Sequence, residues 1–435
     1  MMRSLYSGVA GLKTHQVRMD VIGNNIANVN TVGFKSSNVL FQDVLYQTSQ
    51  RSTGSNIANG VGGVNAKQVG LGTTTATITK ELAGTGSAET TGNTYDLMLN
   101  GDSFFIVSRG GINYYTKVGA FKKDGAGYLV TGNGEMVMGW QVDPDNPNQI
   151  RKDMVSALQV ESAANMYSEP EATTEVTVAG NIDKQSNDFK DGGAHVMNVT
   201  IYDKKGYAYN VKMNVTQNNT ADKNTYTVSV ASITDSNNVA ITAGYQLSGD
   251  QLVYDADSGE FISVGGGDAI TLTINDDTFS PINMDFSTST MYATQGKNTL
   301  ALDRGSLKGL GLGRKMGVLD EVSINNDGKI YGVYDNGEEK LLGQIAVARF
   351  TNPAGLEAVG NNLYQTTQNS GDFDGIGQEV TEGGGSMSQG VIEMSDVDLS
   401  KEFTDMIITQ RGFQANSRTI TVSDTMLEEL INLKR

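Results

Sequence analysis

Two stretches at opposite ends of the chain decide the fold: LYSGVAGLKTHQVRMDVIGNNI at residues 5–26 and LSKEFTDMIITQRGFQANSRTITVSDTML at residues 399–427. Apolar residues recur every seven positions in both stretches, which is typical of one helix packed along another. The sequence therefore predicts two helices, from about residue 1 to 29 and from about 395 to 435, that pair as a coiled-coil-like domain. Ser4 is the expected N-cap of the first helix and Ser395–Asp398 supply N-cap candidates for the second.

Each apolar stripe is narrow, and nothing in its own segment covers it. Polar residues such as Gln16 and Ser417 interrupt the adjoining positions, so an isolated pair of these helices would be marginal. Many copies packed side by side can cover what one pair cannot, and the pattern favours self-assembly over a helical hairpin private to one chain. The residues predicted to mediate this assembly are Leu5, Val9, Leu12, Met19, Ile22, Ile26, Leu399, Phe403, Met406, Phe413, Ile420 and Leu427.

The composition of the chain excludes several classes of function. A chain of 435 residues suggests two to four domains, and a net charge of -17 argues against nucleic acid and against anionic membrane surfaces. The absence of cysteine excludes disulfides, thiolate metal sites and a cysteine nucleophile. No apolar run approaches the ~20 residues that span a bilayer, and the N-terminus lacks the apolar core of a secretory signal peptide. If the protein leaves the cell, we expect a route without signal-peptide cleavage.

The middle of the chain changes to a period of two, with short apolar segments separated by Asn-Gly and Asp-Gly dipeptides, which predicts antiparallel strands and hairpins. The sequence thus indicates a multidomain α+β protein with two mainly antiparallel β domains nested between the terminal helices. The predicted parts are a helical domain of 1–30 with 395–435, extended arms at 31–72 and 366–394, a discontinuous β domain of 73–148 with 291–365, and an inserted outer β domain at 149–290.

Residues able to carry chemistry are sparse. His15 and His195 are the two histidines, and they lie in separate segments, which gives poor support for a catalytic triad or a histidine metal site. The glycine-rich run at 309–313 lacks the spacing of a phosphate-binding loop, and the Asp/Gly runs at 255–259 and 372–375 lack the closing glutamate of a calcium loop. We therefore expect no enzyme activity, no metal and no cofactor.

Both ends carry longer motifs. Residues 20–35, DVIGNNIANVNTVGFK, resemble the N-terminal signature of the flagellar rod and hook axial protein family, and residues 397–418 resemble its C-terminal signature. In the middle, GDSFF at 101–105 and FTNPAGL at 350–356 resemble the hook members of this family. The residues that carry the terminal signatures are Asn24, Asn25, Asn28, Asn30, Thr31, Gly33, Phe34, Gln410, Arg411, Phe413, Gln414 and Asn416.

The resemblance implies a structural subunit of the bacterial flagellar hook, which assembles helically into a flexible curved tube and acts as a universal joint that transmits torque from rod to filament. The implied partners are many copies of the same chain, the distal rod, the hook cap, the hook-filament junction protein and the flagellar type III export machinery, with neither nucleic acid nor membrane insertion. The implied location is the extracellular hook, attached to the basal body and reached without a cleaved signal peptide.

Two alternatives stay open. A distal rod protein shares the terminal signatures but is a rigid shaft, and we expect rod proteins to lack an inserted domain as large as 149–290. A secreted β-rich binding protein, whose helices pair only within the monomer, is the alternative from another class. For the hook reading, we expect the Gly/Ser/Thr/Asn-rich arms at 49–72 and 366–390 to provide compliance when the tube bends.

Overall fold

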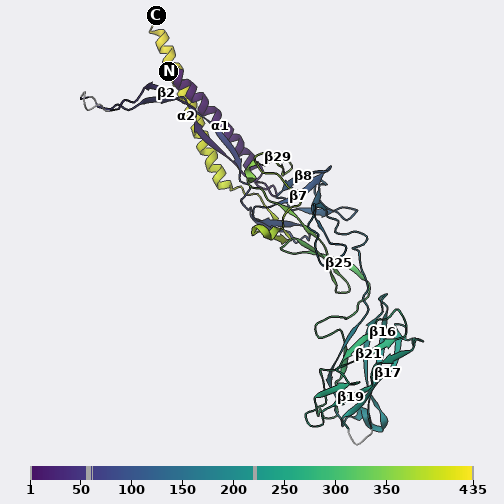
Figure 1. Cartoon of the computed structure of the whole chain (residues 1–435). Coiled ribbons are helices and arrows are strands. Elements are labelled where there is room, and N and C mark those ends of the chain that lie inside the picture. Colours follow the sequence, from purple (N-terminus) through teal and green to yellow (C-terminus); the bar gives the residue numbers. More distant parts are fainter. Residues whose placement is uncertain (1, 55–59, 61, 219–222, 434–435) are drawn as a thin grey trace. The chain divides into compact units, whose positions relative to one another are not determined.

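The computed structural model describes residues 2–54, 60, 62–218 and 223–433. The chain forms two compact units, drawn in Figure 1. Unit 1 comprises Met1–Ser162, Val322–Tyr331 and Leu341–Arg435, and unit 2 comprises Ala163–Glu321 and Gly332–Lys340. The chain crosses from one unit to the other at residue 162 and within strands β25 (Gly317–Ile324), β26 (Lys329–Tyr334) and β27 (Glu339–Ile345).

Two α-helices lie at the ends of the described chain, α1 (Met2–Ala27) and α2 (Leu399–Asn432). Asp398 caps α2 as expected, because its Oδ1 accepts the backbone N–H groups of Ser400 at 2.8 Å and Lys401 at 3.3 Å. The N-cap prediction for Ser4 was wrong: α1 already includes Met2, so Ser4 lies inside the helix. The two helices pack on each other, and with the mainly antiparallel strands of both units this confirms the predicted fold class.

The β strands of unit 1 form a sheet with a buried face and four short ladders. In the sheet, β27 is followed by β11 (Met136–Gln141), β7 (Phe104–Arg109), β8 (Ile112–Thr116), β30 (Leu363–Gln365) and β29 (Glu357–Gly360). Short strands extend it, namely β9 (Phe121–Lys123), β10 (Leu129–Thr131), β12 (Ser156–Ala157) and β28 (Val347–Ala348). Phe104, Ile106, Trp140 and Tyr364 belong to its core, and this sheet with its core is called the β body of unit 1.

The four ladders of unit 1 are antiparallel and two-stranded. They pair β1 (Ser37–Asp43) with β4 (Thr73–Lys80), β2 (Tyr46–Gln50) with β3 (Lys67–Gly70), β5 (Ala88–Thr90) with β32 (Val391–Glu393), and β6 (Leu97–Asn100) with β31 (Ser386–Gln389). The ladder of β1 and β4 packs against α1. Short 3-10 helices occur at Pro353–Gly355 and Val380–Gly383.

The two predicted arms differ from each other in the structure. The segment 366–394 is not a free extended arm, because β31 and β32 join ladders and the side chains of Val380 and Met387 are buried. The segment 31–72 contributes β1, which packs on α1, and the hairpin of β2 and β3, whose residues are all exposed. Residues 55–59 and 61 of that arm lie outside the described residues. Of the two predicted arms, only the exposed hairpin of β2 and β3 thus projects in the described residues as the prediction expected.

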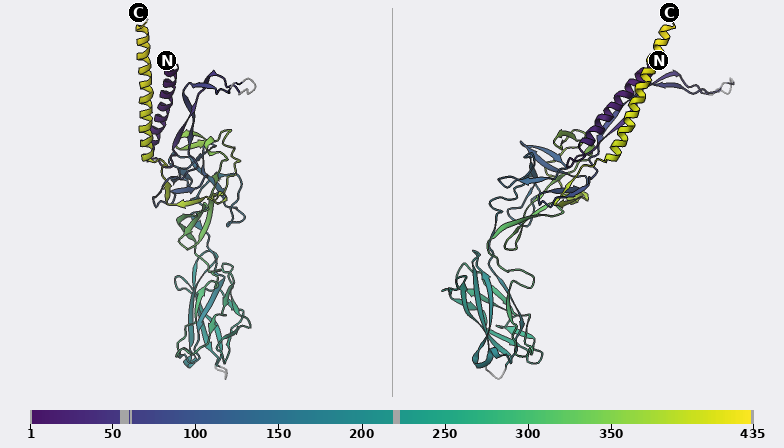
Figure 2. Two further views of the ribbon diagram at one scale, coloured as in Figure 1. Left: turned by 90° about the vertical axis from the view of Figure 1, so that its left-hand side faces the viewer. Right: turned by 180° about the vertical axis from the view of Figure 1, so that it is seen from behind.

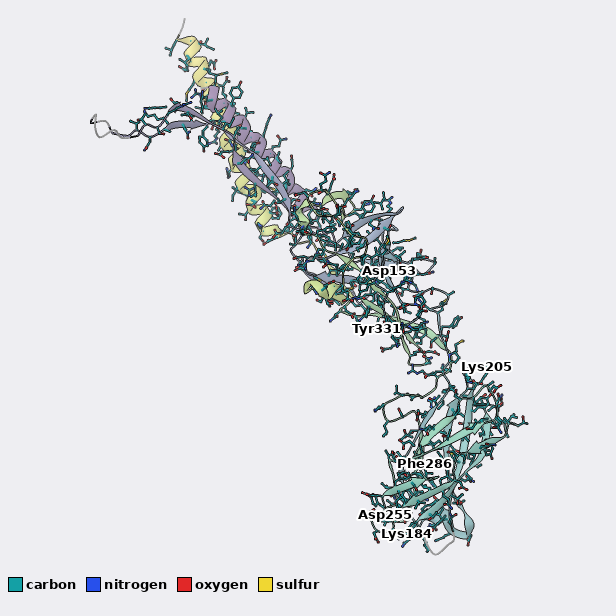
Figure 3. All side chains as sticks on the ribbon, in the orientation of Figure 1. Asp153, Lys184, Lys205, Asp255, Phe286 and Tyr331 are labelled. Atoms are coloured by element: carbon teal, nitrogen blue, oxygen red, sulfur yellow. The ribbon has the colours of Figure 1, made fainter. Side chains whose placement is uncertain are left out.

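Unit 2 is a sandwich of two sheets around one apolar core. One sheet has the order β15 (Ala194–Tyr202), β16 (Ala208–Gln217), β17 (Thr225–Asp235), β19 (Gln251–Tyr254) and β20 (Phe261–Val264). The other has the order β18 (Tyr245–Leu247), β21 (Ala269–Ile274), β22 (Ile282–Asp285), β14 (Glu175–Asn181) and β23 (Ser289–Thr290), with β24 (Ala301–Arg304) also paired to β14. Phe286 belongs to the shared core, while Lys205 lies at one end of the unit and Lys184 and Asp255 lie at the other (Figure 3).

The predicted boundaries at 148 and 291 differ from this division, and burial gives the reason. Leu158 follows the Pro/Asn-rich stretch but is buried in unit 1, where β12 extends the sheet beside β11. At the other end, Leu300 and Leu302 belong to the core of unit 2, because β24 pairs with β14. Turn-rich composition marks a break in regular structure, but the next apolar residues decide which core the chain joins.

Candidate functional site

The paired helices α1 and α2 run antiparallel, as two views show (Figures 1 and 2). Near the start of α1, the hydroxyl of Ser4 lies 3.2 Å from that of Ser423. Near its end, Asn25 Nδ2 donates to Glu402 Oε1 at 3.0 Å. Sequence numbers therefore rise along α1 as they fall along α2, and this register places Met2 opposite Thr425. The last turns of α2 extend beyond the described start of α1.

The residues at the contact between the helices are small or polar. A Cβ on Gly11 would lie 2.7 Å from Asn416 Nδ2, and a Cβ on Gly412 would lie 2.5 Å from the His15 ring. Gly8 packs in the same way against Ile420, where a Cβ would approach Cγ1 to 3.1 Å. Glycine at these positions thus allows the two helix backbones to approach closely.

This close contact does not bury most of the predicted apolar stripe. Ile22 is buried, whereas Val9 is exposed on α1 and Leu399, Phe403 and Phe413 are exposed on α2. The remaining stripe residues are half-buried, and these are Leu5, Leu12, Met19, Ile26, Met406, Ile420 and Leu427. Of the predicted stripe, Ile420 thus packs on Gly8 and Ile22 is buried, whereas most of the other residues are left partly uncovered.

Further apolar side chains that sequence reasoning did not include are exposed on α2. They are Ile407, Ile408, Val422, Met426, Leu430 and Ile431, and Leu433, which caps the C-terminus of α2, is exposed as well. Met426 and the residues after it lie beyond Met2, the described start of α1 in the observed register. Ile431, for example, is 68% exposed. A contiguous helix that exposes this many large apolar residues is typical of an interaction surface.

Charged and titratable groups lie inside the seam. Arg18 Nη2 pairs with Asp405 Oδ1 at 3.0 Å, and both side chains are partly exposed. Burial raises the pKa of Glu402, although the hydrogen bond from Asn25 opposes this shift. Burial also lowers the pKa of His15, and the charge of Arg18 lowers it in the same direction. Each helix therefore carries a titratable group whose pKa is shifted by burial.

The signature residues at the end of α1 build the reversal that follows it. Asn25 is 1% exposed; its Nδ2 donates to the Ser37 carbonyl at 2.9 Å, and its Oδ1 accepts from the Ser37 N–H at 3.1 Å. Asn28 accepts from the Thr31 hydroxyl at 3.1 Å and donates to the Asn24 carbonyl at 2.9 Å. Asn25 thereby joins α1, α2 and β1 at one point.

Gly33 and Phe34 complete the reversal, whereas Asn24 and Asn30 are exposed. Gly33 has φ +65°, and a Cβ there would lie 2.8 Å from the Val118 side chain and 3.1 Å from its backbone N. Phe34 is buried directly after it. Only glycine fits this position without displacing the backbone of the β body.

The signature residues of α2 divide into two groups. Asn416 lies at the seam, where its Nδ2 donates to the Gly412 carbonyl at 3.1 Å. Gln410, Arg411 and Gln414 are exposed, and Arg411 donates to Gln414 Oε1 at 3.3 Å. The exposed group therefore lies largely open to solvent in a single chain.

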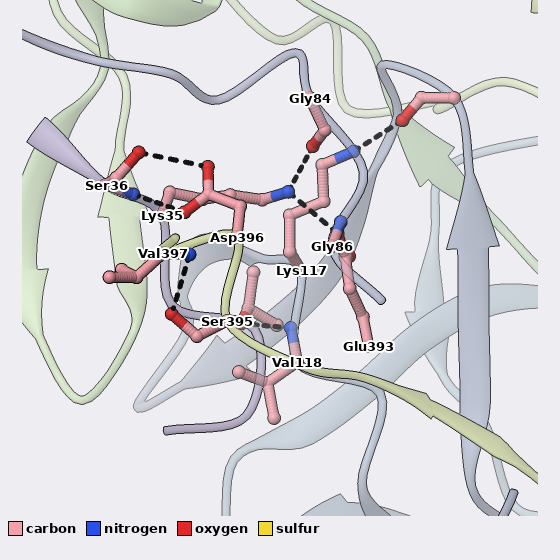
Figure 4. Close-up of polar contacts among 12 residues, drawn as sticks. Lys35, Ser36, Gly84, Gly86, Lys117, Val118, Glu393, Ser395, Asp396 and Val397 are labelled. Atoms are coloured by element: carbon pink, nitrogen blue, oxygen red, sulfur yellow. Dashed lines mark hydrogen bonds and ion pairs between the residues drawn. The ribbon is translucent and has the colours of Figure 1, made fainter. Parts of the chain in front are cut away.

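Sequence reasoning missed a buried ion pair below the helices. Lys35 Nζ lies 2.7 Å from Glu393 Oε1, and both side chains are 0% exposed. Figure 4 shows Lys35 also reaching the carbonyl of Gly84, while the Gly86 N–H donates to Glu393 Oε1 at 2.7 Å. Lys35 follows α1 by a few residues and Glu393 precedes α2 by a few. This pair, with its Gly84 and Gly86 contacts, is called the helix anchor below.

Two further contacts surround the helix anchor (Figure 4). Asp396 accepts from the Ser36 N–H at 2.7 Å and contacts the Ser36 hydroxyl at 3.3 Å. Lys117 Nζ donates to the Gly101 carbonyl at 2.5 Å, and burial followed by the charge of Lys35 lowers the pKa of Lys117 to about 8. Lys35 stands within the N-terminal signature, but lysine is usually exposed, so nothing in the sequence alone identified it as buried.

The described residues contain no cluster of three or more histidine, cysteine, aspartate or glutamate side chains placed to hold a metal ion. His195, far from His15 in sequence, contacts Asp188 Oδ2 at 3.1 Å and the Leu300 carbonyl at 2.9 Å within unit 2. Of the helices in the described ranges, none combines the length and apolar character needed to cross a membrane.

Three family models match separate segments of the chain. "Flagella basal body rod protein" matches residues 5–35, "Flagellar hook protein FlgE/F/G D1 domain" matches 98–181, and "Flagellar basal body rod FlgEFG protein C-terminal" matches 388–433. The N-terminal match covers the reversal and all of α1 except its first three residues, and the C-terminal match covers all of α2. The helix pair and the anchor are thus the region where both terminal models meet.

Whole-length relatives are also found. The chain is 37% identical to the flagellar hook protein FlgE of Borreliella burgdorferi and 34% identical to that of Treponema pallidum, and both alignments cover 100% of each chain. It is 29% identical to the flagellar basal-body rod protein FlgG of Bacillus subtilis, again over 100% of each chain. That alignment includes unit 2, so an inserted domain does not by itself separate hook from rod.

Proposed function

The chain belongs to the flagellar hook protein family and is a structural subunit of the bacterial flagellar hook, and we propose on this premise that its copies assemble through the exposed faces of α1 and α2. The two hook relatives exceed the rod relative in identity, which makes a rod subunit the weaker alternative. This family is one of structural proteins and not of enzymes.

One observation carries the proposal: the helices pair through small and polar residues and leave large apolar residues uncovered. Gly8 and Gly11 lie in the contact within the chain, whereas Phe403, Ile407 and Ile431 are exposed. Within a monomer these apolar side chains contact water, and burying each one on assembly contributes up to about 1.5–3 kcal/mol. A private hairpin, as in a secreted binding protein, gains nothing from this arrangement.

The predicted apolar stripe and the exposed signature residues have different roles in this proposal. Leu5, Leu12, Met406 and Leu427 flank the seam and contact neighbouring copies along the tube. Gln410, Arg411 and Gln414 provide polar contacts between copies, since their side chains are exposed on α2. Asn25, Gly33 and Asn416 act within the chain, where they fix the angle at which the helices leave the β body.

Membership of the hook protein family also supports a more detailed proposal for the assembled tube and its partners. The assembled tube is curved and flexible, acts as a universal joint between rod and filament, and is lined by the helix pairs of its subunits. Its partners are the distal rod, the hook cap, the hook-filament junction protein and the type III export machinery, which carries the chain to the extracellular hook without signal-peptide cleavage. The exposed hairpin of β2 and β3 supplies compliance, because its residues make few contacts within the chain.

The test compares two matched substitutions in the full chain. Phe403 is 50% exposed on α2, and Ile262 is 53% exposed on β20 of unit 2. Phe403→Gln should raise the critical concentration for polymerisation about tenfold, which corresponds to ~1.4 kcal/mol for the half of the ring still open to water. Ile262→Gln should change it less than twofold. Sedimentation across a concentration series measures both, and equal effects of the two variants would refute the assignment of the helices.

A cruder control uses the helices themselves. A chain that lacks about thirty N-terminal and about forty C-terminal residues should not polymerise, while its β units stay folded by circular dichroism. Tubes formed by that chain would show that other surfaces suffice for assembly.

A further inference from the structure

A pocket of about 330 Å³ in unit 1 lies beside the reversal that follows α1. Four segments that are distant in sequence line it: the end of the reversal, the chain between β8 and β9, the turn between β10 and β11, and the turn between β29 and β30. Its walls include Val32, Val118, Ala120, Asn133, Glu135 and Leu363. None of the residues that line this pocket is a lysine or an arginine.

Glu135 is an unusual residue in the pocket wall because its carboxyl group is buried and only one of its two oxygens has a hydrogen-bond partner among the described residues. The residue is 1% exposed, and the hydroxyl of Thr131 donates to its Oε2. The backbone fixes this arrangement, since the Thr131 N–H donates to the Glu135 carbonyl at 2.9 Å. Oε1 is buried and has no hydrogen-bond partner among the described residues. A buried acceptor of this kind is costly, so a donor from elsewhere is expected to reach it.

The other walls indicate the shape of that donor. Val32, Val118, Ala120 and Leu363 are apolar and suit an aliphatic stem, and the amide of Asn133 offers a further polar group. Only one carboxyl oxygen is free, because Thr131 occupies the other. An ammonium group on a long aliphatic stem fits one free oxygen, whereas a guanidinium forms its best contact with both. The chemistry is that of a lysine side chain.

We propose that this pocket receives a lysine side chain from a second copy of the chain. The inference rests on the proposed function, because a homopolymer brings many copies against each other. A copy with a net charge of -17 repels its neighbours, and a lysine seated on a buried carboxyl group offsets part of that repulsion where two copies meet. The pocket therefore acts as a specific contact between subunits, separate from the apolar faces of α1 and α2.

The experiment follows the acetylation of lysines in the full-length protein, before and after polymerisation, by mass spectrometry. In the unaltered protein, assembly should slow acetylation of one lysine at least tenfold. In polymers of Glu135→Gln, protection of the same lysine should fall below twofold. Glu357→Gln is the matched control, because Glu357 is exposed on β29 and its substitution changes the charge equally. The control should keep the full protection.

A second variant covers the case in which Glu135→Gln does not fold. Ala120→Phe fills the pocket and leaves the carboxyl group in place, and it should also abolish the protection. Three results would overturn the inference: unchanged protection in both variants, protection already complete in the monomer, or equal loss in Glu357→Gln. If the unaltered protein does not polymerise, the proposed function fails as well. If it polymerises and the variants behave like it, only the lysine contact is refuted.

Discussion

Replacing Lys35 by methionine should destabilise unit 1 by about 3–5 kcal/mol, because the carboxylate of Glu393 then stays buried without its ion-pair partner. The two groups are 2.7 Å apart, and neither side chain has exposed surface. Glu393 Oε1 would retain the N–H of Gly86, and Oε2 has no partner among the described residues. One backbone hydrogen bond offsets only part of the cost of burying a charge.

The double variant Lys35→Met/Glu393→Leu separates the ion pair from mere packing. It removes both charges, so it should be no less stable than Lys35→Met, although Gly84 and Gly86 each lose a polar contact. The two single effects should therefore fail to add by at least about 2 kcal/mol. Lys123→Met is the control: Lys123 lies 2.8 Å from Glu161, but its side chain is half exposed, so its loss should cost less than about 1 kcal/mol.

The chain provides its own probe for this measurement. Trp140 is the single tryptophan, and it is buried in unit 1, where its Nε1 donates to the carbonyls of Asp153 at 3.1 Å and Ile376 at 2.9 Å. Its fluorescence during urea unfolding at concentrations below polymerisation follows unit 1 without interference from unit 2. Additive effects of the two single variants, or a loss in Lys35→Met no larger than in Lys123→Met, would refute the reasoning.

Further predictions concern the helix seam and the hairpin. Gly11→Leu should lower the free energy of unfolding by about 1–3 kcal/mol, because the new side chain meets Asn416. Gly23→Leu is the control and should be neutral or stabilising, because a Cβ there meets nothing within 4 Å. Urea unfolding followed by the circular dichroism of the helices compares the two variants. Burial lowers the pKa of His15, so neutral His15 should contribute its full stability above pH ~6.5. This stability should be lost as the pH falls through the lowered pKa. In His15→Leu, melting curves recorded between pH ~7.5 and ~5 should no longer show this loss. Deleting residues 46–70 should straighten isolated hooks in electron micrographs, and unchanged curvature would argue against compliance in the hairpin.

The sequence predicted where the helices lie but not which faces pair. The seven-residue period locates α1 and α2 to within a few residues. The period is visible because apolar residues recur along each helix whether they pack within one chain or against another copy. It does not distinguish a contact within one chain from a contact between copies. Gly8, Gly11 and Gly412 decide that question, since they allow a closer approach than leucine or methionine side chains do.

Other features depend on contacts between residues far apart in sequence. The helix anchor joins Lys35 to Glu393, and a lone lysine in a signature gives no hint that a carboxylate lies beside it. The segment 366–394 has the composition of a loop, yet β31 and β32 join ladders there and Val380 and Met387 are buried. Glu135 had no signal at all in the sequence, because its significance lies in an unpartnered atom beside a pocket.

A helical reconstruction of the polymer formed by the full chain would show whether copies assemble through the exposed faces of α1 and α2. The quantity to measure is the exposed surface of Phe403, Ile407 and Ile431, all of which are exposed in the single chain. We expect these side chains to be buried against α1 or α2 of neighbouring copies. A polymer in which they remain exposed, with copies joined only through unit 2 or the β body of unit 1, would contradict this expectation.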